Sequence, residues 1–94
     1  MAIFHVVIRG GARKQLRRCP DHIVDKLETW SDAVEQRSLE EVRKIPGYHD
    51  EPLKGDRTGQ RSIRLSKGYR AIYVVLKDRT VEFVQVEEVS KHEY

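Results

Sequence analysis

The stretch QRSIRLSKGYRAIYVVLKDRTVEFVQVEEV, residues 60–89, predicts three β-strands joined by two tight turns. Apolar and polar side chains alternate along residues 60–66, and residues 69–77 are strongly apolar, as in a central strand of a sheet. Residues 80–89 form the next strand. Because the connections are so short, neighbouring strands must run in opposite directions. The stretch therefore predicts an antiparallel β-meander.

One further strand is predicted ahead of the meander. Residues 2–9 are rich in Ile, Val and Phe, which favours a strand. No basic residue precedes this apolar run, so we interpret it as a strand at the edge of the sheet and not as a signal peptide. Gly10-Gly11 is expected to break the strand, and residues 12–18 are expected to form a short helix.

The next segment predicts an amphipathic helix. Pro20 suits the first turn of a helix, and apolar side chains recur after it on one helical face. These are Ile23, Leu27, Trp30 and Val34. We interpret Trp30 as a core residue and not as a platform for a ligand. Residues 38–41, SLEE, match a capping box that begins a third helical segment, and Pro46-Gly47 ends it.

The order of these elements predicts a compact α+β fold in a single domain, residues 1–94. Two to three helices are expected on one face of the antiparallel meander, with the N-terminal strand at the sheet edge. The chain has no apolar run long enough to cross a membrane. Its single cysteine, Cys19, cannot form an internal disulfide. We therefore expect a cytoplasmic protein with no membrane partner.

Positive charge is concentrated in the middle of the sequence. The net charge is +3, from 18 Lys and Arg against 15 Asp and Glu. Residues 43–79 hold ten basic and four acidic side chains, whereas residues 1–42 are balanced and residues 80–94 are acidic. A basic stripe on a small domain favours a polyanionic partner, most simply a nucleic acid.

The residues that could carry chemistry point to phosphate and proton transfer. Common phosphate-loop, dinucleotide and zinc motifs are missing and the four histidines are scattered, so we expect no metal site and no cofactor. RNA can be cleaved by a base for the ribose 2′-hydroxyl, a cation for the phosphorane and an acid for the leaving oxygen. Glu51 is a candidate base and His92 a candidate acid. Arg64 or Arg70 is a candidate phosphate ligand, and Tyr94 could stack on a base or donate a proton.

Arg64 and Arg70 are expected to lie opposite each other, because the turn at Lys67-Gly68 is their midpoint. Like charges that face each other destabilise a sheet, so an anion between them would explain the pair. The alternative is that both side chains extend into solvent. A solvated basic loop is likewise the alternative to a binding site in residues 51–64.

Three short motifs together resemble a known family. They are EPLKGDRTG at residues 51–59, GYRAIY at residues 68–73 and KHEY at residues 91–94. In this order they are similar to the RelE/ParE superfamily of toxins from bacterial type II toxin–antitoxin systems, and most similar to RelE-type mRNA interferases of the YoeB-like and HigB-like branches. The resemblance implies a metal-independent endoribonuclease that cleaves mRNA to inhibit translation. The implied partners are a cognate antitoxin, mRNA, and the ribosome with the 16S rRNA of its A site.

The resemblance also implies roles for individual residues. Glu51 matches the catalytic base of YoeB-like toxins, Arg70 the arginine that contacts the scissile phosphate, and His92 the catalytic histidine. The residues expected to bind RNA or its phosphates are Lys54, Arg57, Arg61, Arg64, Lys67 and Tyr94. Glu93 separates His92 from Tyr94, whereas a YoeB-like chain has its tyrosine directly after its histidine.

Two other functions remain open. ParE-type toxins of the same superfamily inhibit DNA gyrase and are not nucleases, but they generally lack the combination of acid, arginine and late histidine. A purely structural member would use its basic stripe only to bind an acidic antitoxin. The first alternative predicts DNA damage signalling, and the second predicts neither mRNA loss nor gyrase inhibition.

Overall fold

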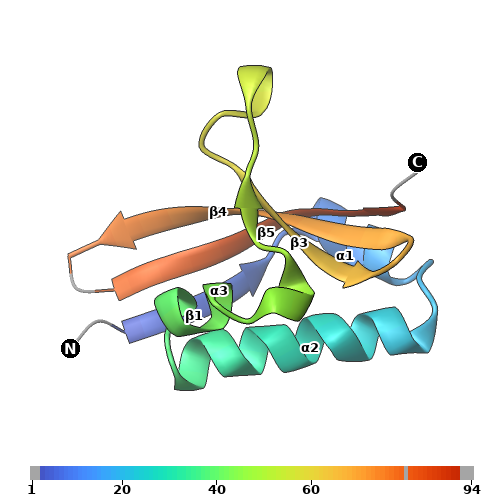
Figure 1. Ribbon diagram of the computed structural model, residues 1–94, viewed down its shortest axis with the longest axis horizontal. Coiled ribbons are helices and arrows are strands. Elements are labelled where there is room, and N and C mark those ends of the chain that lie inside the picture. The colour runs from blue at the N-terminus through green and yellow to red at the C-terminus, as the bar shows by residue number, and fades with distance from the viewer. Residues whose placement is uncertain (1–2, 80, 92–94) are drawn as a thin grey trace.

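The computed structural model describes residues 3–79 and 81–91, and these residues form a five-stranded sheet (Figure 1). The strands are β1 (Ile3–Ile8), β2 (Glu51–Pro52), β3 (Arg61–Ser66), β4 (Tyr69–Asp78) and β5 (Val81–Lys91). Their order across the sheet is β1-β5-β4-β3-β2. β3, β4 and β5 form an antiparallel meander, and β1 lies at the edge, parallel to β5. The predicted meander, edge strand and α+β class are confirmed.

β2 was not predicted, because a two-residue strand is too short to show a periodic pattern. Its Glu51 pairs with Ser62, and its Pro52 pairs with Arg61 of β3. The first residues of the EPLKG motif are therefore part of the sheet and do not belong to a free loop.

Within the described residues, three α-helices precede the meander: α1 (Gly10–Leu16), α2 (Asp21–Gln36) and α3 (Leu39–Arg43). α2 runs along one face of the sheet (Figure 1) and buries the predicted apolar stripe. The stripe consists of Ile23, Leu27, Trp30 and Val34, each at most 1% exposed. The ring of Trp30 packs against that of Tyr73 in β4, with 5.2 Å between their centroids, which confirms Trp30 as a core residue. None of the described helices is long and apolar enough to span a membrane.

Local sequence signals explain where two helices begin. The hydroxyl of Ser38 accepts a hydrogen bond from the Glu41 amide at 3.2 Å, which confirms the predicted cap of α3. Gly10-Gly11, by contrast, forms the first turn of α1 and does not separate the helix from β1. β1 ends at Ile8, before the glycines, so the predicted end of the strand is confirmed, whereas the helix begins two residues earlier than predicted. The first amides of a helix have no intrahelical partners, so glycine weakens a first turn less than a helix interior. The helix also ends earlier than predicted, at Leu16 and not at residue 18.

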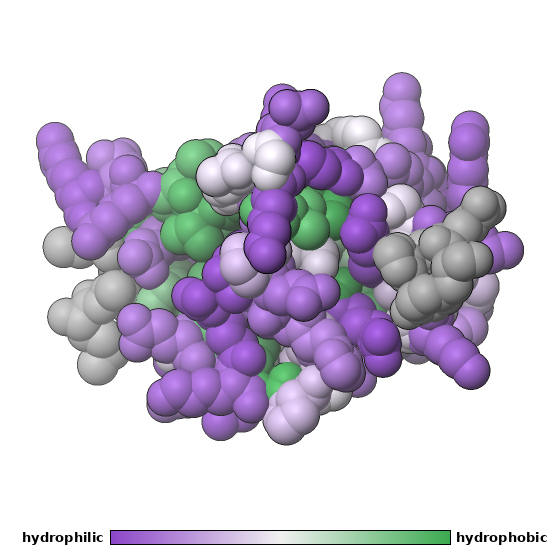
Figure 2. Space-filling model, turned by 45° about the horizontal axis from the view of Figure 1, so that its top comes forward, coloured by the Kyte–Doolittle hydropathy of each residue, from purple (hydrophilic) through white to green (hydrophobic). Residues whose placement is uncertain are grey.

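The face of the sheet opposite α2 carries residues 53–60, which we call the β2–β3 loop. The loop rises from the sheet as a narrow projection (Figure 1). Gly55 and Gly59 have φ angles of 66° and 99°, which residues with a Cβ rarely adopt, so these glycines allow the loop to turn. Figure 2 shows hydrophilic side chains over the projection and hydrophobic side chains exposed on either side of it.

Candidate active site

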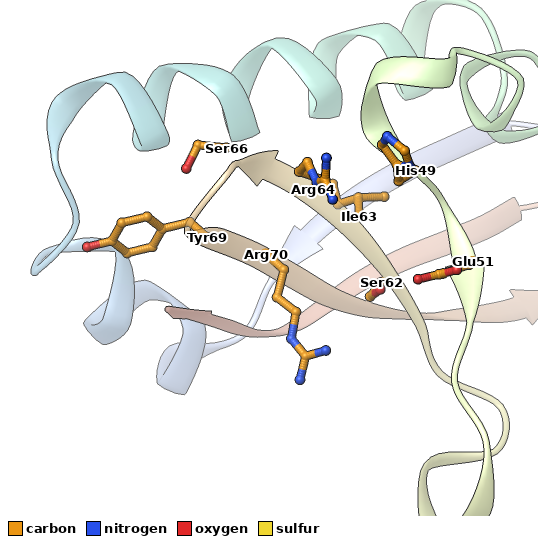
Figure 3. A pocket seen from close by; sticks show the side chains of 8 residues that line it. All are labelled: His49, Glu51, Ser62, Ile63, Arg64, Ser66, Tyr69 and Arg70. Carbon is orange, nitrogen blue, oxygen red and sulfur yellow. The ribbon is translucent and has the colours of Figure 1, made fainter. Parts of the chain in front are cut away.

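A pocket of about 100 Å³ opens beside β2, β3 and the start of β4 (Figure 3). It is lined by His49, Glu51, Ser62, Ile63, Arg64, Ser66, Tyr69 and Arg70. The pocket brings together the candidate base, Glu51, and both candidate phosphate ligands, Arg64 and Arg70.

Glu51 reaches the pocket because β2 pairs with β3. Its Cα is paired with that of Ser62, and Figure 3 shows its side chain pointing toward Ser62. The residue is exposed, so water can exchange protons with its carboxyl group. Two residues before Glu51, His49 has left-handed backbone angles, φ 45° and ψ 49°, at the end of the 3₁₀ turn η1 (Pro46–Tyr48). The chain changes direction at His49 and then enters β2.

Arg64 and Arg70 are directly opposed on β3 and β4, as predicted, and a β-bulge follows Arg64. Arg64 is exposed and Arg70 is half-buried. The Nε–H group of Arg70 is buried without a hydrogen-bond partner among the described residues. A buried donor in that state costs free energy that an anionic acceptor would recover. This pair is therefore suited to bind a phosphate group.

The side chain of Arg57 connects the projecting β2–β3 loop to the sheet. Its Nη2 atom lies 2.9 Å from Oε1 of Glu88 on β5, and its Nε donates to the side chain of Gln60, also at 2.9 Å. Burial raises the pKa of Glu88, but hydrogen bonds from Arg57 and Ser90 and the charges of Arg57 and Arg70 outweigh it, so the pKa lies below its ordinary value. Glu88 is therefore a charged partner of the loop at neutral pH.

Arg61 is bound to a buried carboxylate. Its Nε lies 2.7 Å from Oδ1 of Asp50, whose side chain is 1% exposed. The hydroxyl of Tyr73 donates a hydrogen bond to Oδ2 of the same carboxylate. Burial, and then the hydrogen bond to Asp50, raises the pKa of Tyr73 far above its ordinary value, so the phenol keeps the proton that it donates. Asp50 thus has two strong donors in place of water.

Comparison with known proteins identifies the fold. No family model matches the chain, and no curated protein sequence matches it either. Among solved structures, the YoeB/ParE toxin from Agrobacterium tumefaciens matches with a TM-score of 0.67 and 20% identity, over 95% of this chain and 99% of that toxin. The toxin–antitoxin complex RelBE2 from Mycobacterium tuberculosis matches with a TM-score of 0.68 and 18% identity, over 97% of this chain and 100% of the matched chain. YafQ from Escherichia coli matches with a TM-score of 0.66 and 20% identity, over 92% of this chain and 90% of YafQ.

The chain has a RelE-like toxin fold. This confirms the fold that the three sequence motifs implied. At these identities the likeness concerns the fold, so the roles of single residues depend on where the structure places them.

The predicted RNA-binding residues lie in different surroundings of the RelE-like fold. Lys54 is exposed at the base of the β2–β3 loop, and Lys67 is exposed in the turn between β3 and β4. Arg57 and Arg61 are engaged in the two ion pairs described above. The RNA-binding role of all four residues stays a prediction.

His92 and Tyr94 lie outside the described residues. β5 is described as far as Lys91, whose Cα pairs with that of Tyr69, a residue of the pocket. The roles of His92 and Tyr94 therefore stay predictions as well.

Sequence reasoning missed several residues in or beside the site, among them His49, Asp50 and Tyr73. The run HDE at residues 49–51 places three titratable side chains in succession, and it was the available signal for the first two. Tyr73 lies within an apolar strand and resembles any aromatic core residue, so nothing in the sequence connects it with Asp50.

The histidines of the described chain are dispersed. His49 lines the pocket, whereas His5 lies on β1 and His22 on α2. No group of three His, Cys, Asp or Glu side chains in the described residues is arranged to hold a metal ion. The pocket itself offers a carboxylate for proton transfer and two guanidinium groups for an anion.

Proposed function

We propose that this protein is the toxin of a type II toxin–antitoxin module and an endoribonuclease that cleaves mRNA in the ribosomal A site. The proposal rests on the pocket in which Glu51 lies with the opposed pair Arg64 and Arg70. The RelE-like fold supports the toxin role, since the three matching structures described above are of toxins or of a toxin–antitoxin complex.

In the proposed reaction, Glu51 removes the proton of the ribose 2′-hydroxyl, and the resulting oxygen attacks the adjacent phosphorus. Arg70 and Arg64 stabilise the phosphorane charge, because a guanidinium group can bind two phosphate oxygens. His92 donates a proton to the 5′-oxygen as its bond to phosphorus breaks. The products are a 2′,3′-cyclic phosphate and a free 5′-hydroxyl, and the step consumes neither water nor a cofactor.

The buried Nε–H of Arg70 supports its role as the phosphate ligand, because a phosphate oxygen would supply the acceptor that the described residues lack. His92 is assigned as the acid because it directly follows Lys91, which pairs with the pocket residue Tyr69. An imidazole can donate and accept protons near neutral pH.

The proposed partners are mRNA, the ribosome with its 16S rRNA, and a cognate antitoxin, all in the cytoplasm. Lys54, Lys67 and Tyr94 are assigned to RNA binding outside the reacting centre. One of the matching structures is a toxin–antitoxin complex, which supports an antitoxin as the regulatory partner.

The proposal is tested by induced expression with primer extension on a reporter mRNA. Wild type is expected to arrest growth and to cut the mRNA within codons, whereas Glu51→Gln, Arg70→Ala and His92→Ala should each lose both effects. Glu28→Gln, at an exposed position on α2, is the matched control and should behave as wild type.

Two results would contradict the proposal. Growth arrest with uncut mRNA and inhibited gyrase supercoiling would support the ParE-like alternative. Cleavage that persists in Glu51→Gln and Arg70→Ala would show that the nuclease, if present, does not use this pocket.

A further inference from the structure

Asp50 is a buried acid that the proposed reaction does not use, and it lies immediately before Glu51. Its side chain is 1% exposed and receives hydrogen bonds from Arg61 and from the hydroxyl of Tyr73. Tyr73 is itself fully buried, and its ring packs against Trp30 at 5.2 Å between centroids. The carboxylate is thereby connected to the core of the protein.

These contacts lie one register position from Glu51. Glu51 is paired with Ser62, which is paired with Ile72. At the next register position, Arg61 of β3 is paired with Tyr73 of β4. Asp50 immediately precedes β2, and its carboxylate accepts hydrogen bonds from both Arg61 and Tyr73. The contacts therefore tie the residue that precedes β2 to β3, the neighbouring strand, and to β4 beyond it.

The backbone of Glu51 has few other constraints. β2 consists of two residues and pairs on one side, with β3. On its N-terminal side, His49 has a left-handed conformation that a residue with a Cβ rarely adopts. On its C-terminal side, the β2–β3 loop projects from the sheet (Figure 1). Such a short strand needs tertiary contacts to keep one position, and Asp50 makes the buried ones.

A buried carboxylate is costly unless it is paired and hydrogen-bonded, and its net contribution to stability is often small even then. The location of the Asp50–Arg61 pair beside Glu51 suggests a benefit other than stability. Catalysis depends strongly on position, since a displacement of about 1 Å can lower a rate about 100-fold.

We propose that Asp50, held by Arg61 and Tyr73, is a positioning residue that fixes the backbone of β2 and thereby aims Glu51 into the pocket (Figure 3). Asp50 acts through the backbone and does not touch the RNA. The catalytic consequence rests on the proposed function, whereas the structural consequence, a fixed Glu51, does not.

The test uses Tyr73→Phe, which removes one donor to Asp50 and keeps the ring against Trp30. Tyr48→Phe is the matched control, because Tyr48 is also buried, at 6% exposure, and its ring faces the ammonium group of Lys26. Cleavage is measured in single turnovers on ribosomes programmed with a short mRNA. Binding is measured with the same mRNA carrying a 2′-O-methyl group at the cut site.

Tyr73→Phe is expected to lower the cleavage rate constant at saturation by about tenfold or more, with mRNA affinity unchanged. Tyr48→Phe should leave both quantities as in wild type. If Tyr73→Phe does not fold, Asp50→Asn, which keeps the shape of the side chain, replaces it with the same expectation. An unchanged rate constant, or a loss of affinity equal to the loss of rate, would overturn the inference.

A second readout separates this inference from the proposed function. Backbone NMR relaxation should give Glu51 a rigid order parameter in wild type, about 0.85, and a clearly lower value in Tyr73→Phe. Tyr48→Phe should leave Glu51 rigid. If wild type does not cleave RNA, the proposed function fails, and the order parameters alone decide whether Asp50 fixes Glu51. Equal rigidity of Glu51 in wild type and Tyr73→Phe would overturn the inference even if wild type is active.

Discussion

Removing the guanidinium group of Arg61 is expected to lower the free energy of unfolding by about 2–3 kcal/mol. In Arg61→Ala the Asp50 carboxylate, 1% exposed, keeps only the Tyr73 hydroxyl of its two described donors. Breaking a fully buried ion pair by removing one partner costs about 3–5 kcal/mol. The side chain of Arg61 is 21% exposed, so water can enter the vacated space and hydrate the carboxylate in part, which places the estimate below that range.

Urea unfolding followed by Trp30 fluorescence measures this loss. Trp30 is the single tryptophan of the sequence and is fully buried, so its emission reports on the core. With a slope of about 1–3 kcal/mol per molar urea, the midpoint should fall by about 0.7–3 M. Arg18→Ala is the matched control, because Arg18 is exposed and none of the described residues forms an ion pair with it. It should remain within about 0.5 kcal/mol of wild type.

The double variant Asp50→Ala/Arg61→Ala should lose less stability than the sum of the two single variants, because it leaves no unpaired buried charge. Equal midpoints for Arg61→Ala and Arg18→Ala would refute the reasoning. Strict additivity in the double variant would show that the two side chains contribute independently.

Two other features are accessible to the same titration. Gly59 has a φ of 99°, so Gly59→Ala is expected to cost about 1–2 kcal/mol, whereas Gly47→Ala, where an added Cβ meets no atom within 4 Å, should be nearly neutral; equal costs at the two sites would contradict this. The lowered pKa of Glu88 means that the Arg57–Glu88 pair stabilises the fold above the ordinary carboxyl pKa of 4.5, and that this contribution is lost as the pH falls through the pKa of the folded state. The side chains of Arg57 and Glu88 are 40% and 30% exposed, so at neutral pH the free energy of unfolding of wild type should exceed that of Arg57→Ala by at most about 1 kcal/mol. A difference that grows in acid would contradict the assignment.

The meander and the long helix could be predicted because they repeat a pattern over many residues. Trp30 and its stripe follow the helical period across sixteen residues of α2, and β3 shows alternation before a short turn. β2 has no such signal, since its two residues are held by pairing with Arg61 and Ser62 and by the anchoring of Asp50. The parallel direction of β1 could not be predicted either, because nothing in residues 3–8 indicates which strand they pair with.

Some contacts of the candidate site could likewise be predicted from the sequence, and others could not. Counting from the turn placed Arg64 opposite Arg70, because both lie within one hairpin. Arg57 and Arg61 looked equally available for RNA, but each has an acidic partner whose position depends on the fold. Glu88 is 31 residues from Arg57, and Asp50 is 11 residues from Arg61. Spacing in a sequence predicts contacts across a tight turn, but it does not predict contacts across a long loop or between distant elements.

The position of β5 between β1 and β4 has a consequence for how the molecule is made. β5 pairs with β1, which is synthesised early, and with β4, which directly precedes it. The sheet is therefore incomplete until β5 is available. Pairing between residues far apart in sequence is slow compared with local pairing. During translation, the helices emerge well before the surface that they must cover. The pocket residue Arg70 likewise lies on β4, whose second neighbour, β5, is synthesised after it, so this strand of the site is fully paired only once β5 has formed.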